Sequence, residues 1–134
     1  MIILLDTSTS LCKLTFIDGD KIHNSEWQAG RGLAKGLLSY IDKELFLFDK
    51  KWSEITAICV FKGPGSFTGL RIGITVMNTI ADANNIPIVG GSGENWQNET
   101  ISKLADGKND KIVIPLYGSE PNITCANSTK KVTI

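Results

Sequence analysis

The feature that most constrains the fold is an apolar run at residues 55–61, followed directly by a glycine-rich loop. Only Thr56 interrupts the run with a polar side chain. A short strand that is apolar on both sides is typical of a parallel sheet with both faces covered. Residues 63–73 then read Gly-Pro-Gly-Ser-Phe-Thr-Gly-Leu-Arg-Ile-Gly and lead into a helix expected from Leu70 to Asn84. This strand–loop–helix unit predicts an α/β fold.

Hydrophobic patterning places further elements around this unit. Residues 2–5 are apolar, and residues 11–17 and 21–27 alternate between apolar and polar side chains. This pattern predicts a three-stranded antiparallel meander whose last strand is mostly polar and lies at an edge of the sheet. The expected elements are strands at 2–5, 11–17, 21–27, 55–61 and 87–89, an edge strand at 112–117, and helices from Leu33 over about four turns, at 70–84 and at 94–104. Their order resembles a ribonuclease-H-like half, the unit of actin-like ATPase (ASKHA) folds, with a mixed five-stranded sheet and flanking helices.

The composition changes after residue 106, where Asp-Gly-Lys-Asn-Asp is typical of a linker. We therefore predict a ribonuclease-H-like lobe at residues 1–106. Residues 107–134 are expected to form a short C-terminal extension or the remnant of a second lobe. They are too few to build a core of their own, but enough to add a hairpin to the first lobe.

Charge and composition exclude several classes of function. The 134 residues include 14 Lys+Arg and 14 Asp+Glu, so the net charge is zero. Without a basic half the chain has no electrostatic means of binding nucleic acid strongly by itself. No apolar run approaches the ~18 residues of a membrane span, and the N-terminus lacks signal-peptide features, so we expect a cytoplasmic protein. Three widely spaced cysteines without a C-x-x-C motif predict neither a disulfide framework nor a zinc site.

The glycine-rich loop matches neither common phosphate-binding motif. No Lys follows at the P-loop spacing, and Thr68 stands where the third glycine of G-x-G-x-x-G belongs. Thr68 is instead expected to cap the helix. Gly69 and Gly73 lie four residues apart, so they leave a bare strip on one side of that helix. Close approach of a second helix, either from this chain or from a partner, would explain the strip.

The first expected helix has an unusually broad apolar face. Its apolar positions recur at i+4 and are Leu33, Leu37, Ile41 and Leu45, while the polar positions expected on the other side are Lys35, Asp42, Lys43 and Glu44. A face of this breadth serves packing on a sheet, contact with a partner, or both. The sequence does not divide its residues between these roles.

Few residues offer catalytic or metal chemistry. His23 is the one histidine, and on a polar edge strand it is expected to be solvated rather than to ligate a metal. Asp6, Thr7, Ser8 and Thr9 resemble the phosphate-binding hairpin of actin-like ATPases, with Ser8 in the place of a glycine. Asp6 is then either a turn-forming residue or part of a relic or working phosphate site.

Three segments together resemble the TsaB (YeaZ) family: 3–9, 63–73 and 86–90. The resemblance covers residues 2 to about 96. It implies a bacterial, non-catalytic subunit of the machinery that makes threonylcarbamoyladenosine beside the tRNA anticodon. Such a subunit pairs with its catalytic relative TsaD through its first two helices, and the ATPase TsaE assembles on the pair. ATP and metal are then expected in the partner subunits, with no cofactor in this chain, and tRNA is met only through the complex.

The resemblance also implies which residues meet the partner. Alone, the chain is expected to pair with a second copy through the same surface. The expected contact residues are Leu33, Leu37, Ile41, Leu45, Gly69, Arg71, Ile72, Gly73, Val76 and Met77. Two features depart from the family pattern: at most a stub follows residue 106, and residues 30–33 read Gly-Arg-Gly-Leu where a His-Ser pair is usual. The alternatives are a small nucleotide-dependent enzyme or peptidase-like relative, and a regulatory paralogue that binds TsaD.

Overall fold

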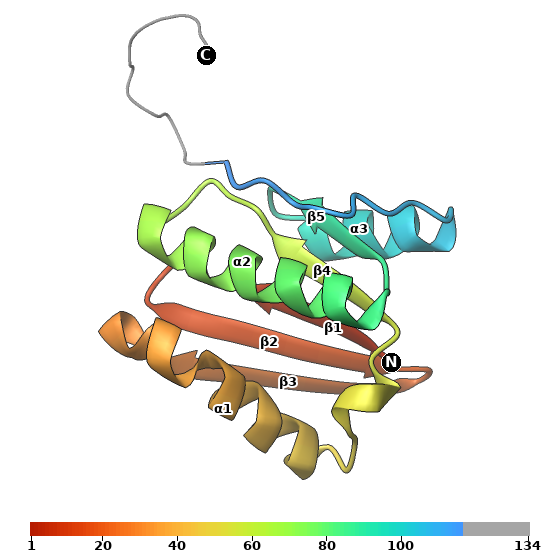
Figure 1. Cartoon of the computed structure of the whole chain (residues 1–134), viewed down its shortest axis with the longest axis horizontal. Helices are drawn as coiled ribbons and strands as arrows, with labels where there is room; N and C mark the ends of the chain where they lie inside the picture. The colour runs from red at the N-terminus through yellow and green to blue at the C-terminus, as the bar shows by residue number, and fades with distance from the viewer. Residues whose placement is uncertain (117–134) are drawn as a thin grey trace, which may run out of the picture.

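In a computed structural model that describes residues 1–116, all five strands join one mixed sheet (Figure 1). The strand order is β3-β2-β1-β4-β5. The strands are β1 (Ile2–Asp6), β2 (Leu11–Asp18), β3 (Lys21–Gln28), β4 (Ala57–Phe61) and β5 (Ile88–Gly91). This sheet confirms the predicted α/β class and the predicted meander at the start of the chain.

The two halves of the sheet differ in strand direction because their connections differ in length. β1, β2 and β3 are antiparallel neighbours, and Gly19 lets the chain turn tightly between β2 and β3 with a φ of 62°. β1, β4 and β5 are parallel neighbours, which requires long crossovers. The helices α1 (Leu33–Leu47) and α2 (Phe67–Asn84) supply these crossovers.

Helices cover both faces of the parallel half. Figure 1 shows α1 and α2 on one face of the sheet, with α3 (Trp96–Ala105) on the other face beside β5. Phe61 makes an edge contact with the Trp96 ring, at 5.7 Å between centroids, and Thr100 of α3 is fully buried. Because side chains alternate along a strand, Ile58 and Val60 face the other way. All five residues of β4 are therefore buried, as its apolar sequence predicts.

The core lies mainly between the sheet and the α1–α2 layer. α1 and α2 contribute residues at helical spacing, β2 contributes mainly alternate residues, and β1 and β4 are buried on both faces. The largest fully buried side chains are Phe16, Ile3, Leu4, Leu5, Leu14, Leu37, Ile41, Leu45, Ile58, Leu70, Ile74 and Met77. None of the helices within residues 1–116 combines the length and the apolar character needed to cross a membrane.

The start of α2 differs from the prediction. The helix begins at Phe67 rather than Leu70, and its cap is Ser66 rather than Thr68. The Ser66 Oγ accepts a hydrogen bond from the Gly69 N–H at 3.3 Å, which satisfies one of the free donors of the first turn. The prediction of Thr68 as the cap is therefore wrong by two residues.

The chain beyond residue 106 also differs. Residues 112–116 form no strand, although they were expected to lie at a sheet edge, and Tyr117 lies outside the described residues. Both backbone groups of Val113 bond the side chain of Asn78 on α2, and the Asp110 N–H donates to the Ile88 carbonyl. The Asn78 side chain thus takes both backbone bonds of Val113, and the first residue of β5 takes the Asp110 N–H. Residues 117–134 of the predicted extension lie outside the described part of the chain.

Candidate partner-binding surface

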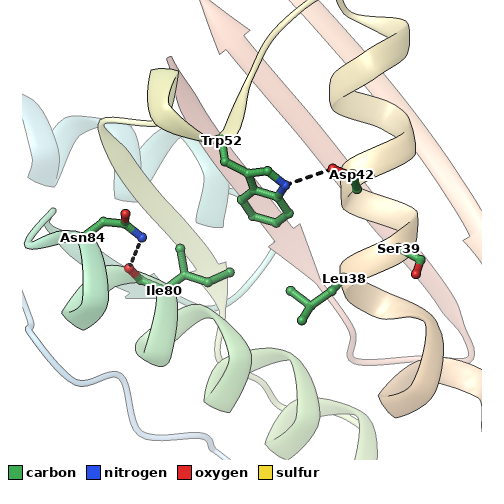
Figure 2. Close-up of a pocket in the computed structure, with 6 residues that line it drawn as sticks. All are labelled: Leu38, Ser39, Asp42, Trp52, Ile80 and Asn84. Atoms are coloured by element: carbon green, nitrogen blue, oxygen red, sulfur yellow. Dashed lines mark hydrogen bonds between the residues drawn. The ribbon is translucent and has the colours of Figure 1, made fainter.

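An apolar groove runs between α1 and α2 on the side of the molecule away from the sheet. Its volume is about 520 Å³. The 3-10 turn η2 (Trp52–Glu54), which connects α1 to β4, closes one end of it. The lining residues are Leu38, Ser39 and Asp42 of α1, Trp52 of η2, and Ile80 and Asn84 of α2 (Figure 2).

One hydrogen bond fixes the closed end of the groove. The Trp52 indole Nε1 donates to Oδ1 of Asp42 at 3.1 Å, and Figure 2 shows the indole ring lying between the two helices. On the opposite wall the Asn84 amide donates to the Ile80 carbonyl of its own helix at 2.9 Å. The Trp52 indole nitrogen and the Asn84 amide nitrogen are thus partnered within the chain, and the lining of the groove is mainly apolar.

The helical period explains why apolar side chains are left on this surface. On α1, Leu37 and Ile41 point into the core, and Leu38, one residue further round the helix, is 54% exposed. On α2, Ile72, Val76 and Ile80 follow one another at i+4 and are half-buried. Together they form an apolar surface on both helices, which we call the α1–α2 surface.

The structure divides the predicted partner-contact residues between core and surface. Leu33, Leu37, Ile41, Leu45, Gly69, Gly73 and Met77 are buried within this chain. Ile72 and Val76 are half-buried on the α1–α2 surface, and Arg71 is exposed on the first turns of α2. Of the predicted contact residues, only Ile72, Val76 and Arg71 have side chains that a partner could reach in this structure.

The close contact predicted by Gly69 and Gly73 is made by a loop and not by a helix. A Cβ at Gly69 would collide with the Thr7 carbonyl oxygen, and one at Gly73 with the Thr7 hydroxyl and methyl groups. Thr7 is fully buried and its hydroxyl donates to the Gly69 carbonyl at 2.7 Å. The interpretation of these glycines as a helix-packing strip is therefore wrong: the β1–β2 turn occupies that space.

The polar turn at residues 6–9 is held by bonds within the chain. One Asp6 carboxylate oxygen accepts from the Ser8 N–H at 2.9 Å, which is the geometry of an Asx turn. The Ser8 carbonyl accepts from the Ser66 N–H at 2.8 Å, and the Thr9 hydroxyl bonds Leu11. Asp6 therefore forms the turn, which is the first of the two roles that the sequence left open for it.

His23 is not the solvated residue that the sequence predicts. Its Nε2 lies 2.8 Å from Oε1 of Glu44 on α1. Its ring stacks on Phe16 with 5.8 Å between centroids and lies tilted against Phe48 with 5.3 Å between centroids. Glu44 itself is 7% exposed, so its expected place on the polar side of α1 is also wrong. The pair joins α1 to the edge strand β3.

The other reactive groups give no cluster in the described part of the chain. No group of three His, Cys, Asp or Glu residues within residues 1–116 is arranged to hold a metal ion. Cys12 and Cys59 are free and buried, and burial raises the pKa of their thiols to about 12 and about 11. Cys125 lies outside the described residues.

The Arg71 guanidinium carbon lies 5.2 Å from the centre of the Phe67 ring, as in a cation–π contact.

The groove residues Trp52, Asp42, Ile80 and Asn84 were not singled out from the sequence as partner contacts. Trp52 and Asp42 are ten positions apart and meet only because the chain reverses after α1. The sequence held one indication of this surface: α1 has more apolar residues than its core row at i+4 needs, and Leu38 and Phe46 lie outside that row.

Comparison with known proteins gives the family. The model of a family described as TsaD, tRNA N6-adenosine threonylcarbamoyltransferase, matches residues 27–93, which is half of the chain. The tRNA threonylcarbamoyladenosine biosynthesis protein TsaB of Haemophilus influenzae is 33% identical over 89 residues, covering 66% of this chain and 37% of that protein. The TsaB of Escherichia coli is 28% identical over 106 residues, covering 79% and 43%. This chain belongs to the TsaB (YeaZ) family.

The fold agrees with that of solved TsaB-family proteins. YeaZ from Pseudomonas aeruginosa superimposes with a TM-score of 0.64 and 31% sequence identity, covering 68% of this chain and 43% of that one. The five-stranded mixed sheet with its flanking helices is therefore the predicted family fold. The chain spans about half the length or less of most of the TsaB proteins that it matches.

Proposed function

We propose that this chain is a non-catalytic subunit in the formation of threonylcarbamoyladenosine in tRNA, and that it binds a catalytic subunit of the TsaD type. Membership of the TsaB family supports the pathway. The observation that supports the binding role is the α1–α2 surface, on which Leu38, Ile72, Val76 and Ile80 leave apolar area without a partner in the described chain. Apolar surface gathered in a groove is a feature of protein interaction sites.

The chemistry of the described residues favours a scaffold over a catalyst. The single histidine is bonded to Glu44, and Asp6 is engaged in its own turn. Catalysis by acid–base or metal chemistry needs a cluster of such groups in a cleft. We therefore place ATP, metal and the transfer step in the partner subunits, including TsaE, and propose that tRNA is bound only by the assembled complex in the cytoplasm.

The surface also defines what the chain does when its partner is absent. Two copies that meet through the α1–α2 surface would bury the same apolar side chains by a two-fold arrangement. Binding to TsaD would then replace one copy by the partner. A subunit of this kind activates its partner only if it binds the productive conformation more tightly than the others.

Reconstituted tRNA modification tests this function. TsaD and the other components from the same bacterium are assayed for threonylcarbamoyladenosine with and without the full chain. We expect formation to require the chain, and Val76→Asp to lower it at least about tenfold because a carboxylate would be buried in the interface. Thr75→Asp, at an exposed position one residue away on α2, is the matched control and should retain activity.

Two outcomes would contradict the proposal. If threonylcarbamoyladenosine forms equally well with and without the chain, the chain is not a required subunit. Activity that falls when the chain is added would show a regulator that occupies TsaD, which was the alternative left open by the sequence.

A further inference from the structure

We propose that the side chains of Lys103, Asn109 and Asp110 cap the outer edge of β5 and keep it from pairing with β5 of a second copy of the chain. The cap is independent of the proposed function, because none of these residues lies on the α1–α2 surface. Figure 1 shows the chain after α3 running back past β5 and α2.

β5 is the last strand of the sheet, so one of its sides has no neighbouring strand. In a parallel ladder alternate residues bond to each side, and the carbonyls of Pro87 and Gly91 accept from β4 and the residue after it. The N–H and C=O groups of Ile88 and Gly90 therefore point to the outer side. Free backbone groups along a strand edge are a template for pairing with another chain.

All four of these outward groups are bonded to partners outside the strands. The Ile88 N–H donates to Oδ1 of Asn109 at 3.1 Å, and the Ile88 carbonyl accepts from the Asp110 N–H at 2.8 Å. The Gly90 N–H donates to Oδ2 of Asp110 at 2.9 Å, and the Gly90 carbonyl accepts from Nζ of Lys103 at 3.3 Å. These partners occupy every donor and acceptor that a strand added to β5 would need.

The chain after the cap covers the same edge. Val113 is buried, and a Cβ added at Gly90 would collide with its side chain. Oδ1 of Asn109 also accepts from the Lys111 N–H at 2.8 Å, and Lys111 has a φ of 65°, in the region that favours glycine. A lysine persists in this conformation because its neighbours hold it there. All four residues of β5 are buried, although β5 is an edge strand.

The two edges of the sheet differ in the charges that they carry. β3, at the other edge, has exposed charged side chains at Lys21 and Glu26, and charge on an edge strand opposes pairing. Residues 83–93, which include β5, contain no charged side chain. Two uncapped β5 edges would therefore meet without bringing like charges together, so a second copy is the strand that an open β5 would accept.

Hydrogen exchange of the full chain tests whether the cap holds the edge. Asp110→Ala removes the acceptor of the Gly90 N–H, and Asp110→Asn keeps an oxygen that can accept it. We expect the Gly90 amide to exchange at least about tenfold faster in Asp110→Ala, and within about threefold of the unchanged chain in Asp110→Asn. The Lys62 N–H, which bonds the Gly91 carbonyl on the inner side of β5, is the internal reference and should keep its rate.

Sedimentation of the full chain tests what the cap prevents. All proteins carry Val76→Asp, which suppresses the proposed association through the α1–α2 surface. We expect this chain to be a monomer, and the chain that also carries Asn109→Ala and Asp110→Ala to form dimers or larger species in which the Gly90 amide is protected again. Asp106→Ala removes an exposed carboxylate outside the cap, is the matched control and should leave a monomer. Thermal unfolding checks that each variant folds.

Three results would overturn the inference. An unchanged exchange rate at Gly90 in Asp110→Ala would show that the carboxylate does not hold the edge. A monomer at every concentration, despite fast exchange at Gly90, would show that the cap does not prevent pairing. Dimers in which the Gly90 amide stays unprotected would form through another surface. If the chain with both alanines does not fold, Asp110→Ala alone in the same two measurements decides between these results.

Discussion

At the scale of single residues, Gly65 and Gly73 are the points where the β1–β2 turn touches the loop before α2 and the first turns of α2. A Cβ at Gly65 would meet the Ser8 side chain and backbone, and a Cβ at Gly73 would meet Thr7. The fully buried Thr7 hydroxyl ties the same turn to the Gly69 carbonyl. The motif therefore fixes the β1–β2 turn against the start of α2.

This contact predicts coupling between Gly73 and Thr7. Gly73→Ala should lower the free energy of unfolding by about 1–3 kcal/mol, because the added methyl overlaps the Thr7 side chain. Thr7→Ala should cost about 1 kcal/mol for the lost hydrogen bond. The double variant should lose less than the sum of the two, since Thr7→Ala makes room for the methyl. Urea unfolding of all four proteins measures the coupling, and additive losses would contradict the contact.

The buried thiols predict an alkaline limit to stability. Burial raises the pKa of the Cys59 thiol from 9.0 to about 11, so folding favours its protonated form. This contribution is complete below pH 9 and is lost as the pH rises toward 11. With Cys125→Ser in both proteins, the free energy of unfolding should fall between pH 8.5 and 10.5 by roughly 1–2 kcal/mol more with Cys59 present than in Cys59→Ala. Parallel pH profiles would show that Cys59 does not titrate this way.

At the scale of elements, α1 is attached to β3 by polar and aromatic contacts. His23 bonds Glu44, the Tyr40 hydroxyl donates to Ser25 at 2.6 Å, and Trp27 lies against Tyr40 with 5.0 Å between ring centroids. A carboxylate as buried as that of Glu44 is costly without its partner. The pair therefore sets where α1 sits on the sheet.

The buried pair predicts an asymmetry between single and double variants. His23→Phe keeps the ring stacking but leaves Glu44 without its partner, so it should lower the free energy of unfolding by about 2–4 kcal/mol. His23→Phe combined with Glu44→Leu removes both polar groups and should recover most of that loss. Thermal and urea unfolding measure the difference. A double variant no more stable than His23→Phe would contradict the account of Glu44 as a buried, paired charge.

Elements whose character follows from local periodicity were predictable from the sequence. β4 could be predicted because its residues are apolar, and α1 could be predicted because its core residues recur at i+4. Contacts between distant segments were not, since Thr7 meets Gly73 and Trp52 meets Asp42 only in the folded chain. For the same reason Glu44 was assigned to the wrong side: no local rule places a carboxylate in the core, and its partner is 21 positions away.

At the scale of the whole molecule, the sheet and helices of the described residues gather apolar side chains from two helices on the α1–α2 surface. α3 and the meander present mostly polar side chains outward, and the α1–α2 surface presents Leu38, Ile72, Val76 and Ile80. The net charge of zero gives the chain no general attraction for RNA. A protein with these features is suited to working through another protein, and the α1–α2 surface is the place where that partner is proposed to bind.

The most direct test of this central claim is the mass of the species that the chain forms with TsaD. Light scattering coupled to size exclusion is measured on the full chain alone, on TsaD from the same bacterium alone, and on the mixture. We expect a one-to-one heterodimer in the mixture and its loss with Val76→Asp but not with Thr75→Asp. A mixture that elutes as two independent species would contradict the claim that this chain is a subunit acting through TsaD.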